Sequence, residues 1–281
     1  MKAGEFRMFK YKVKLFSIFL VCLYPIDAIS EYLFTAPPRE SIQKGNEIYK
    51  PIADFLSKYT GETFVYNHPG NWASYSRSMQ KNEFDLAFDG PHFVSWRVHN
   101  LQHDVIAKLP QLHIWRVIAK SDNDSIRSLD DLIGKKVCAP KSPNFGMLTM
   151  MSHYSNPEKE PIHVITKGWK DAFNSVVQGK CVATVIPKTN HKKFDPEFAK
   201  TKSIHTHLPY PNQAFTAGSN LTPSMKSKIT TALLSDEGQE ALTKLRDRFT
   251  RGANVVDAEN EEYEGISMVL KRAVNFTNAG K

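Results

Sequence analysis

Short apolar runs alternate with amphipathic stretches from residue 31 onward, and this alternation constrains the fold more than any other feature. In 46–61, apolar residues recur every three or four positions, which is the period of a helix. The first half predicts strands at 31–37, 63–70 and 84–91 and helices at 46–61 and 71–83. This order is typical of a parallel sheet with helices on both faces.

The same alternation returns in the second half of the chain. A short helix and a strand are predicted in 126–140, followed by a helix at 146–155, a strand at 162–166, a helix at 170–180 and a strand at 181–187. Two extended segments, 112–121 and 212–220, flank this second unit, and a helical tail begins at 222. The predicted fold is therefore α/β, with two doubly wound lobes joined by two crossing strands. Lobe 1 comprises 31–117 and 214–281, and lobe 2 comprises 118–213.

The first 30 residues are typical of a secretory signal peptide. Five basic residues precede the apolar run at 15–24, and small residues at 28–30 suit a signal peptidase. A run of ten residues is too short to span a bilayer. Met8 could be the true start. Lipidation at Cys22 and a buried N-terminal helix remain as alternatives, but export to the periplasm is the main expectation.

Cleavage after Ser30 removes five of the 37 basic residues and two of the 29 acidic residues, which leaves a net charge of +5. A mildly basic exported protein suits anionic ligands or surfaces, although a solvated basic face explains the charge equally simply. Basic residues are not interleaved with aromatic ones in a stripe, so a nucleic-acid partner is not expected.

Two cysteines, Cys138 and Cys181, remain in the mature chain. An exported compartment permits a disulfide. Aligning "GKKVC" with "GKCVA" on adjacent strands places Cys138 opposite Ala183. The two α-carbons would then be roughly 8 Å apart, beyond the ~7 Å limit of a bridge, so the cysteines are predicted to be unpaired. The sequence has no CxxC or HExxH motif and its histidines are scattered, so neither a metal nor a cofactor is expected.

The stretch "FDLAFDGPHF" (84–93) marks a candidate site. An apolar strand stops at Asp89 and Gly90, and His92 follows at once. Ligands of open parallel sheets lie beyond the carboxyl ends of the strands, so Asp89 and His92 are candidate ligand residues. The competing interpretation is a tight Gly-Pro turn in which Asp89 is only a helix cap.

Four stretches in order resemble one family. They are "DLAFDGPHF", "SIRSLDDLIGKKVCAP", "GWKDAFNSVVQGKCVAT" and "LPYPNQAFTAGSNLTPSMKSKITTALL". Together they are similar to the phosphate/phosphonate-type (PhnD-like) periplasmic solute-binding proteins of ABC importers. The resemblance covers about residues 35 to 270. It implies a type II periplasmic-binding fold, with two lobes, a hinge of two crossing strands and a ligand in the cleft.

In this family a serine/threonine-rich turn and a helix N-terminus hold the oxyanion. The matching stretch here is "CAPKSPNFGML", in which Ser142 suits the N-cap and Pro143 the first helical position. Backbone N–H groups of Asn144, Phe145 and Gly146 would then face an anion. The turn departs from the family because it is one residue longer, lacks the usual hydroxyls and carries Phe145 as an apolar wall. An ordinary capped helix is the alternative.

Further cleft residues of the family align with single residues of this sequence. A family aromatic matches Trp72, and a family histidine matches Trp169. Both tryptophans could stack on a ligand, although tryptophan is also a common core residue. A family aromatic on the first crossing strand falls near Ile114, so the resemblance implies that this contact is lost.

Two family carboxylates that meet a ligand ammonium are replaced by Lys188 and Gln213. A lysine inverts the local charge, and two like charges 4 Å apart repel by about 4 kcal/mol at an effective dielectric near 20. The replacement predicts a ligand that is not a zwitterionic aminoalkylphosphonate. The competing interpretation of Lys188 is a solvated surface lysine.

The sequence therefore predicts a monomeric binding protein that captures a small anion and docks on the membrane permease of an ABC importer. The alternative is a sensing module of the same fold that docks on a membrane receptor. An enzyme using Cys138 or Cys181 with a histidine is disfavoured, because no nucleophile–base–orienter set stands out.

Overall fold

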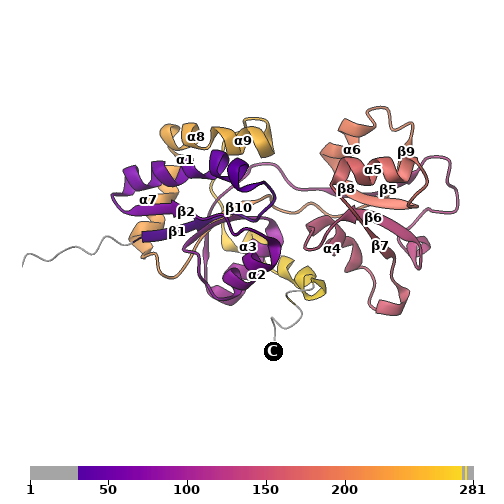
Figure 1. The fold of residues 1–281 in the computed structure, drawn as a ribbon, viewed down its shortest axis with the longest axis horizontal. Helices are drawn as coiled ribbons and strands as arrows, with labels where there is room; N and C mark the ends of the chain where they lie inside the picture. The colour runs from indigo at the N-terminus through magenta and orange to yellow at the C-terminus, as the bar shows by residue number, and fades with distance from the viewer. Residues whose placement is uncertain (1–30, 274–275, 277–281) are drawn as a thin grey trace, which may run out of the picture.

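Two five-stranded mixed sheets lie side by side along the molecule and define two lobes (Figure 1). The computed structural model describes residues 31–273 and 276, so the predicted signal peptide lies outside the described residues. The prediction of an α/β fold with two lobes joined by two crossing segments is confirmed.

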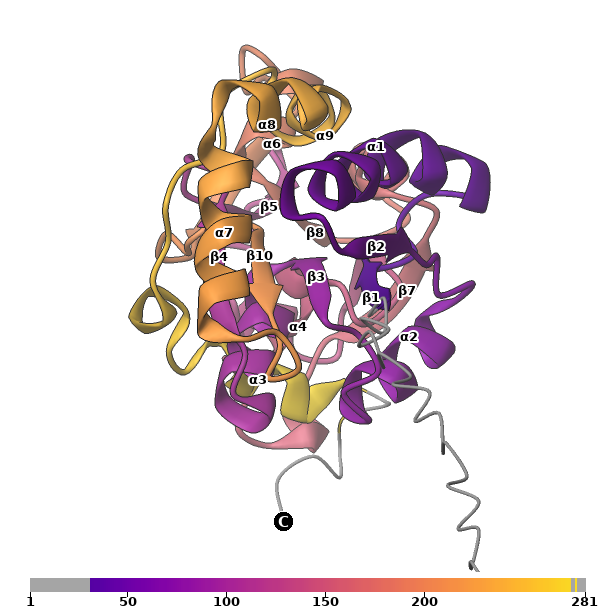
Figure 2. The same cartoon turned by 90° about the vertical axis from the view of Figure 1, so that its left-hand side faces the viewer.

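The first lobe contains a sheet with strand order β2-β1-β3-β10-β4. β1 pairs in parallel with β2 and β3, whereas β10 runs antiparallel to β3 and β4. Figure 2 shows α1, α8 and α9 on one side of this sheet and α2 and α3 on the other. The bounds are β1 Glu31–Thr35, α1 Ile42–Thr60, β2 Thr63–Tyr66, α2 Trp72–Gln80, β3 Leu86–Asp89, α3 Pro91–Leu101, β4 Asp104–Lys108, β10 Ala214–Ala217, α7 Pro223–Leu234, α8 Asp236–Ala241, α9 Thr243–Thr250, η3 Asn260–Tyr263 and η4 Ile266–Arg272.

The second lobe contains a sheet with strand order β7-β6-β8-β5-β9. β6 pairs in parallel with β7 and β8, and β5 runs antiparallel to β8 and β9. The bounds are β5 Trp115–Lys120, η1 Asp130–Leu132, β6 Lys136–Pro140, α4 Phe145–Met151, η2 Pro157–Lys159, β7 Ile162–Thr166, α5 Trp169–Val177, β8 Ala183–Pro187, α6 Lys188–Phe194 and β9 Thr201–Thr206.

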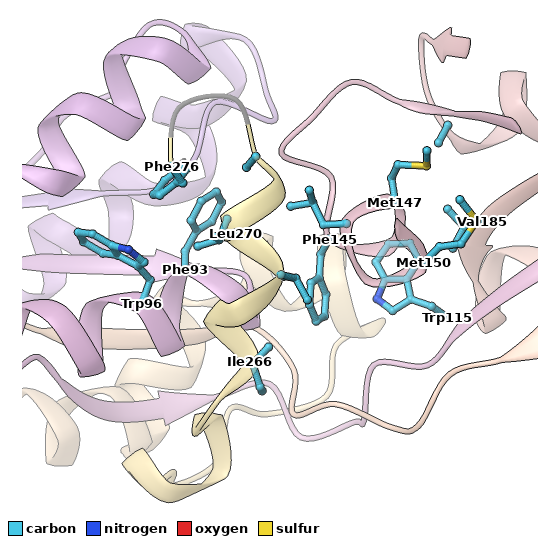
Figure 3. Packing of buried hydrophobic residues seen from close by; sticks show 14 of the residues in the cluster. Phe93, Trp96, Trp115, Phe145, Met147, Met150, Val185, Ile266, Leu270 and Phe276 are labelled. Atoms are coloured by element: carbon cyan, nitrogen blue, oxygen red, sulfur yellow. The ribbon is translucent and has the colours of Figure 1, made fainter. Parts of the chain in front are cut away.

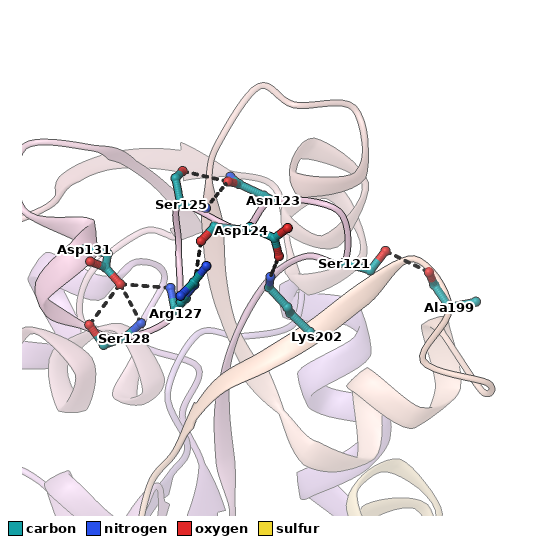
Figure 4. A network of polar contacts seen from close by, with 9 residues as sticks. All are labelled: Ser121, Asn123, Asp124, Ser125, Arg127, Ser128, Asp131, Ala199 and Lys202. Atoms are coloured by element: carbon teal, nitrogen blue, oxygen red, sulfur yellow. Dashed lines mark hydrogen bonds and ion pairs between the residues drawn. The ribbon is translucent and has the colours of Figure 1, made fainter.

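The loop after β5 is held by its own polar side chains (Figure 4). The carboxylate of Asp131 accepts hydrogen bonds from the backbone N–H groups of Arg127 and Ser128, at 2.9 Å each. Lys202 on β9 donates to Asp124 at 3.3 Å. These bonds satisfy backbone donors that lie outside the sheet and join the loop to β9.

The chain crosses between the lobes twice, at 109–114 and at 207–213. β5 belongs entirely to the second sheet, so the first crossing comes before Trp115, whereas the sequence places the boundary after residue 117. The two crossing segments pair through His113 and Tyr210, whose backbone N–H groups donate to each other's carbonyls at 2.8 and 3.0 Å.

The C-terminal segment contacts both lobes. Phe276 packs on Phe93 and Trp96 of α3, with ring centroids 5.8 and 6.0 Å apart (Figure 3). Arg272 reaches the second lobe, where it forms an ion pair with Glu160 and donates to the carbonyl of Tyr154. Residues 266–272 therefore form an interlobe strap, which the sequence did not indicate.

Cys138 and Cys181 form a disulfide, so the prediction of unpaired cysteines is wrong. Their α-carbons are 5.7 Å apart. β8 begins only at Ala183, and Cys181 lies in the preceding turn rather than on the strand. The two-residue offset assumed along a straight strand therefore does not apply, because the turn brings Cys181 back toward β6.

Candidate ligand-binding site

The strand tip at Asp89 leads directly into α3, as the abrupt end of the apolar run indicates. Gly90 is the N-cap of α3, and Pro91 is its first residue. The Asp89 carboxylate accepts hydrogen bonds from the Nε of Arg97, at 2.8 Å, and from the hydroxyl of Tyr75. Asp89 and Arg97 are both fully buried. Asp89 thus forms an ion pair with Arg97, a residue of its own lobe.

His92 contacts the second lobe. Its Nε2 lies 3.1 Å from the carbonyl oxygen of Pro143, and its ring stacks on Phe145 with centroids 4.9 Å apart and planes 7° from parallel. Burial lowers the pKa of His92 to about 3, and the nearby charge of Arg39 acts in the same direction. His92 is therefore a neutral imidazole at the junction of the lobes.

The start of α4 differs from the prediction. The helix begins at Phe145, and its N-cap is Asn144, whose Oδ1 accepts a 3.1 Å hydrogen bond from Met147 N–H. Ser142 is not the cap, because it lies three residues before the first helical residue, Phe145, and the side chain of Asn144 makes the cap hydrogen bond. The backbone N–H of Met147, in the first turn of α4, therefore donates to Asn144.

Gly146 allows α4 to approach the start of β5 closely. A Cβ at this position would lie 2.2 Å from the ring of Trp115. Phe145 packs on the crossing segments as well, with centroids 4.9 Å from Tyr210, 6.1 Å from Trp115 and 6.4 Å from His113. His113 and Trp115, on either side of Ile114, thus pack on Phe145, whereas the loss of an aromatic ligand contact at Ile114 stays a prediction.

The two candidate tryptophans lie in different lobes. Trp169, the first residue of α5, packs on Trp115 with centroids 5.9 Å apart. Trp72, the first residue of α2, stacks on Phe93 at 6.2 Å. Both are partly buried. Trp169 thus belongs to the aromatic cluster around Trp115, whereas Trp72 packs within lobe 1.

Lys188 and Gln213, which the resemblance aligns with family carboxylates, lie near the crossings. Lys188 is exposed at the start of α6, and its backbone N–H donates to the carbonyl of Ile114 at 2.8 Å. Gln213 is buried on the second crossing, and its Oε1 has no hydrogen-bond partner among the described residues.

Several other buried polar atoms near this junction lack a partner within the described part of the chain. They include the Nδ1 atoms of His92 and His113 and the indole nitrogens of Trp115 and Trp169. Buried polar groups are normally hydrogen-bonded, so these atoms are candidate partners for a bound polar molecule.

Sequence reasoning missed Arg39, whose Nη1 is buried without a partner. Arg39 lies four residues after the carboxyl end of β1, as Asp89 and Gly90 lie at the carboxyl end of β3. The strand-end rule that selected Asp89 could therefore have selected Arg39.

Among residues 31–273 and 276, no group of three or more His, Cys, Asp or Glu side chains could hold a metal ion. In that same range, no helix has the length and apolar character needed to cross a membrane.

Comparisons with known proteins agree with this architecture. The family model described as "ABC transporter, phosphonate, periplasmic substrate-binding protein" matches residues 34–263. The "Phosphate-import protein PhnD" of Mycolicibacterium smegmatis is 23% identical over 267 residues, covering 83% of each chain.

Two solved structures share the fold at low identity. PhnD1 of Prochlorococcus marinus, in complex with methylphosphonate, has a TM-score of 0.63 and 14% identity over 86% of this chain and 97% of its own. XAC2383 of Xanthomonas citri, bound to ATP, has a TM-score of 0.69 and 10% identity over 86% and 98%. The family binds and transports substrates rather than catalysing reactions, and it is periplasmic. The chain belongs to the phosphonate-type periplasmic substrate-binding proteins of ABC transporters.

Proposed function

We propose that the mature chain, after removal of residues 1–30, works as a periplasmic monomer. It captures one small phosphorus oxyanion between the two lobes, and it delivers the anion to the membrane permease of an importer. Closure of two lobes about a hinge is the usual action of such proteins.

One observation carries the location of the site. His92 of the first lobe meets Pro143 and Phe145 of the second, at the place where unpaired polar atoms gather. A ligand bound there would contact both lobes and favour their closure. The candidate ligand residues are Trp72, Asp89, His92, Ser142, Asn144, Phe145, Trp169, Lys188 and Gln213.

The class of ligand is supported by charge and by the names of relatives. The mature chain has a net charge of +5, and Arg39, whose Nη1 has no hydrogen-bond partner among the described residues, lies near His92. One relative is named for phosphate import, and one neighbour was solved with methylphosphonate. An anionic phosphorus compound with a small apolar substituent suits the Phe145 wall.

A positively charged tail is disfavoured at this site. Lys188 and Gln213 occupy the positions where the resemblance places carboxylates, so a ligand ammonium would lack its partners. We expect 2-aminoethylphosphonate to bind more weakly than methylphosphonate. Lys188→Ala should weaken anion binding more than tenfold, about 1.4 kcal/mol. The exposed Lys192 on the same helix is the matched control.

Isothermal titration calorimetry of the mature protein tests this function. The titrants are phosphate, phosphite, methylphosphonate and 2-aminoethylphosphonate. We expect saturable binding of one of the first three, at one anion per chain. Absence of binding by all four would refute the proposed function, and tightest binding of the amino compound would refute the assignment of Lys188 and Gln213.

A further inference from the structure

Arg39 carries a positive charge that no described carboxylate neutralises. None of the ion pairs among the described residues includes it. The neighbouring carboxylate, Glu40, pairs with Arg248 at 3.3 Å, although its Oε2 is unpartnered. Charged groups inside proteins normally have a partner, so a guanidinium with a buried, unpaired Nη1 is suited to an anion from outside the chain.

Arg39 and His92 converge over Gly90. A Cβ built on Gly90 would lie 3.3 Å from the Nδ1 of His92 and 3.5 Å from the Nη2 of Arg39. The backbone of Gly90, with φ −73° and ψ 158°, is one that any residue adopts. Because Gly90 has no side chain, the Nδ1 of His92 and the Nη2 of Arg39 face the same point beside its Cα.

The two nitrogens offer opposite hydrogen-bonding chemistry. The carbonyl of Pro143 can only accept, so the Nε2 of His92 must be the protonated nitrogen of the neutral ring. The Nδ1 of His92 then carries a lone pair and can only accept a hydrogen bond. Arg39 can only donate. A ligand that satisfies both must present an anionic oxygen to Arg39 and a protonated oxygen to His92.

We propose that Arg39 and His92 recognise a singly protonated oxyanion above Gly90. Arg39 donates to its charged oxygen, and the Nδ1 of His92 accepts the hydrogen bond of its hydroxyl. This inference rests on the proposed function and deepens it: hydrogen-phosphonate and dihydrogen-phosphate monoanions carry both groups, whereas sulfonates and sulfate have no proton to donate.

The second lobe positions the acceptor. Pro143 fixes which nitrogen of His92 is protonated, and Phe145 fixes the plane of the ring. Both contacts join the two lobes, so His92 is held in the orientation that selects the protonated anion only when the lobes are closed. The charged and titratable groups facing His92 are Arg39 and His113, and burial lowers the pKa of His113 to about 4, so it adds no charge near neutral pH.

The wild-type protein provides the first test, by calorimetry with methylphosphonate and its isostere methanesulfonate. A site that needs a ligand hydroxyl rejects an analogue lacking it, so we expect roughly a hundredfold or greater preference for methylphosphonate. Equal affinity for the two would overturn the recognition of the proton and leave the proposed function intact. Failure of all oxyanions to bind would instead contradict the proposed function itself.

Variants separate the roles of the two residues. Arg39→Gln should weaken methylphosphonate binding at least tenfold, as should Gly90→Ala, whose methyl group intrudes between the two nitrogens. His92→Phe keeps an aromatic ring against Phe145 but removes the acceptor nitrogen, so it should reduce the preference for methylphosphonate over methanesulfonate. Arg77→Gln, on the exposed face of α2, is the matched control.

Glu40→Gln tests whether Arg39 affects binding only through its neighbour Glu40. If Arg39 served only to pair with Glu40, removal of that carboxylate would weaken binding as much as Arg39→Gln does, and the proposal would be overturned. Unchanged affinity in Arg39→Gln, with a wild-type circular dichroism spectrum, would overturn it as well. We expect Glu40→Gln to keep near-wild-type affinity.

Discussion

The Nε of Arg97 donates a 2.8 Å hydrogen bond to the Oδ2 of Asp89, and both side chains are fully buried. The pair fixes the end of β3 to α3, immediately before the candidate site. Asp89→Asn would leave the guanidinium of Arg97 buried without its counter-charge. Removal of one partner of a buried ion pair costs about 3–5 kcal/mol of unfolding free energy.

Urea unfolding of Asp89→Asn measures this cost. The control is Asp54→Asn, which removes an exposed pair with Lys50 whose side chains are 62% and 58% accessible, and which should change stability by about 0–1 kcal/mol. Equal effects of the two variants would show that the Asp89–Arg97 pair does not hold the strand end.

The disulfide between Cys138 and Cys181 should stabilise the second lobe. It closes a loop with a sequence separation of 43, for which the loop-entropy model gives about 4 kcal/mol. The double variant Cys138→Ala/Cys181→Ala should therefore lose about 2–4 kcal/mol. Thiol counting in denaturant without reductant should find no free thiol in the mature protein, and two free thiols would contradict the bridge.

Buried histidines should make stability depend on pH. Burial lowers the pKa of His92 to about 3 and that of His113 to about 4, from an ordinary value of 6.5. Below about pH 6.5 the unfolded chain binds protons that the folded state excludes. The free energy of unfolding should therefore fall as pH decreases from about 6.5 toward 4, by up to about 1.4 kcal/mol per pH unit for each histidine.

Urea unfolding at pH 7, 6 and 5 checks this dependence. His92→Gln removes one of the histidines whose pKa is lowered, so its stability should fall less steeply with decreasing pH than that of the wild type. A slope identical to that of the wild type would show that His92 is not kept neutral by burial.

The interlobe strap should favour the closed arrangement. Arg272 on η4 contacts Glu160 and the carbonyl of Tyr154, and these are contacts between lobes. Arg272→Ala should increase the radius of gyration of the ligand-free protein in small-angle scattering. The exposed neighbour Lys271→Ala is the control, and equal radii for the two variants would show that the strap does not hold the lobes together.

The order of elements was predictable from the sequence, because strand-type runs and helical periods alternate clearly from residue 31 to 91. α3 was missed, since Gly90-Pro91 is typical of a turn and residues 91–97 are buried all round rather than amphipathic. Here Pro91 occupies the first helical position, where its missing N–H costs nothing.

The candidate site was only partly predictable. His92 and Phe145 were selected from a strand end and a helix start, and the structure brings them into contact across the lobes. Arg39 lies in the "TAPPRES" turn, which carries no helical or strand period, so its approach to Gly90 depends on the packing of β1 beside β3. The disulfide was missed for a similar reason, because a turn displaced Cys181 from the assumed strand.

Hydrogen–deuterium exchange of the wild-type mature protein, with and without saturating methylphosphonate or phosphate, tests most directly whether the anion binds between the lobes. The account predicts slower exchange at the start of α3, residues 92–95, together with the start of α4, residues 144–148. Slower exchange in one lobe alone, or in neither segment with either anion at saturation, would contradict a site shared by the two lobes.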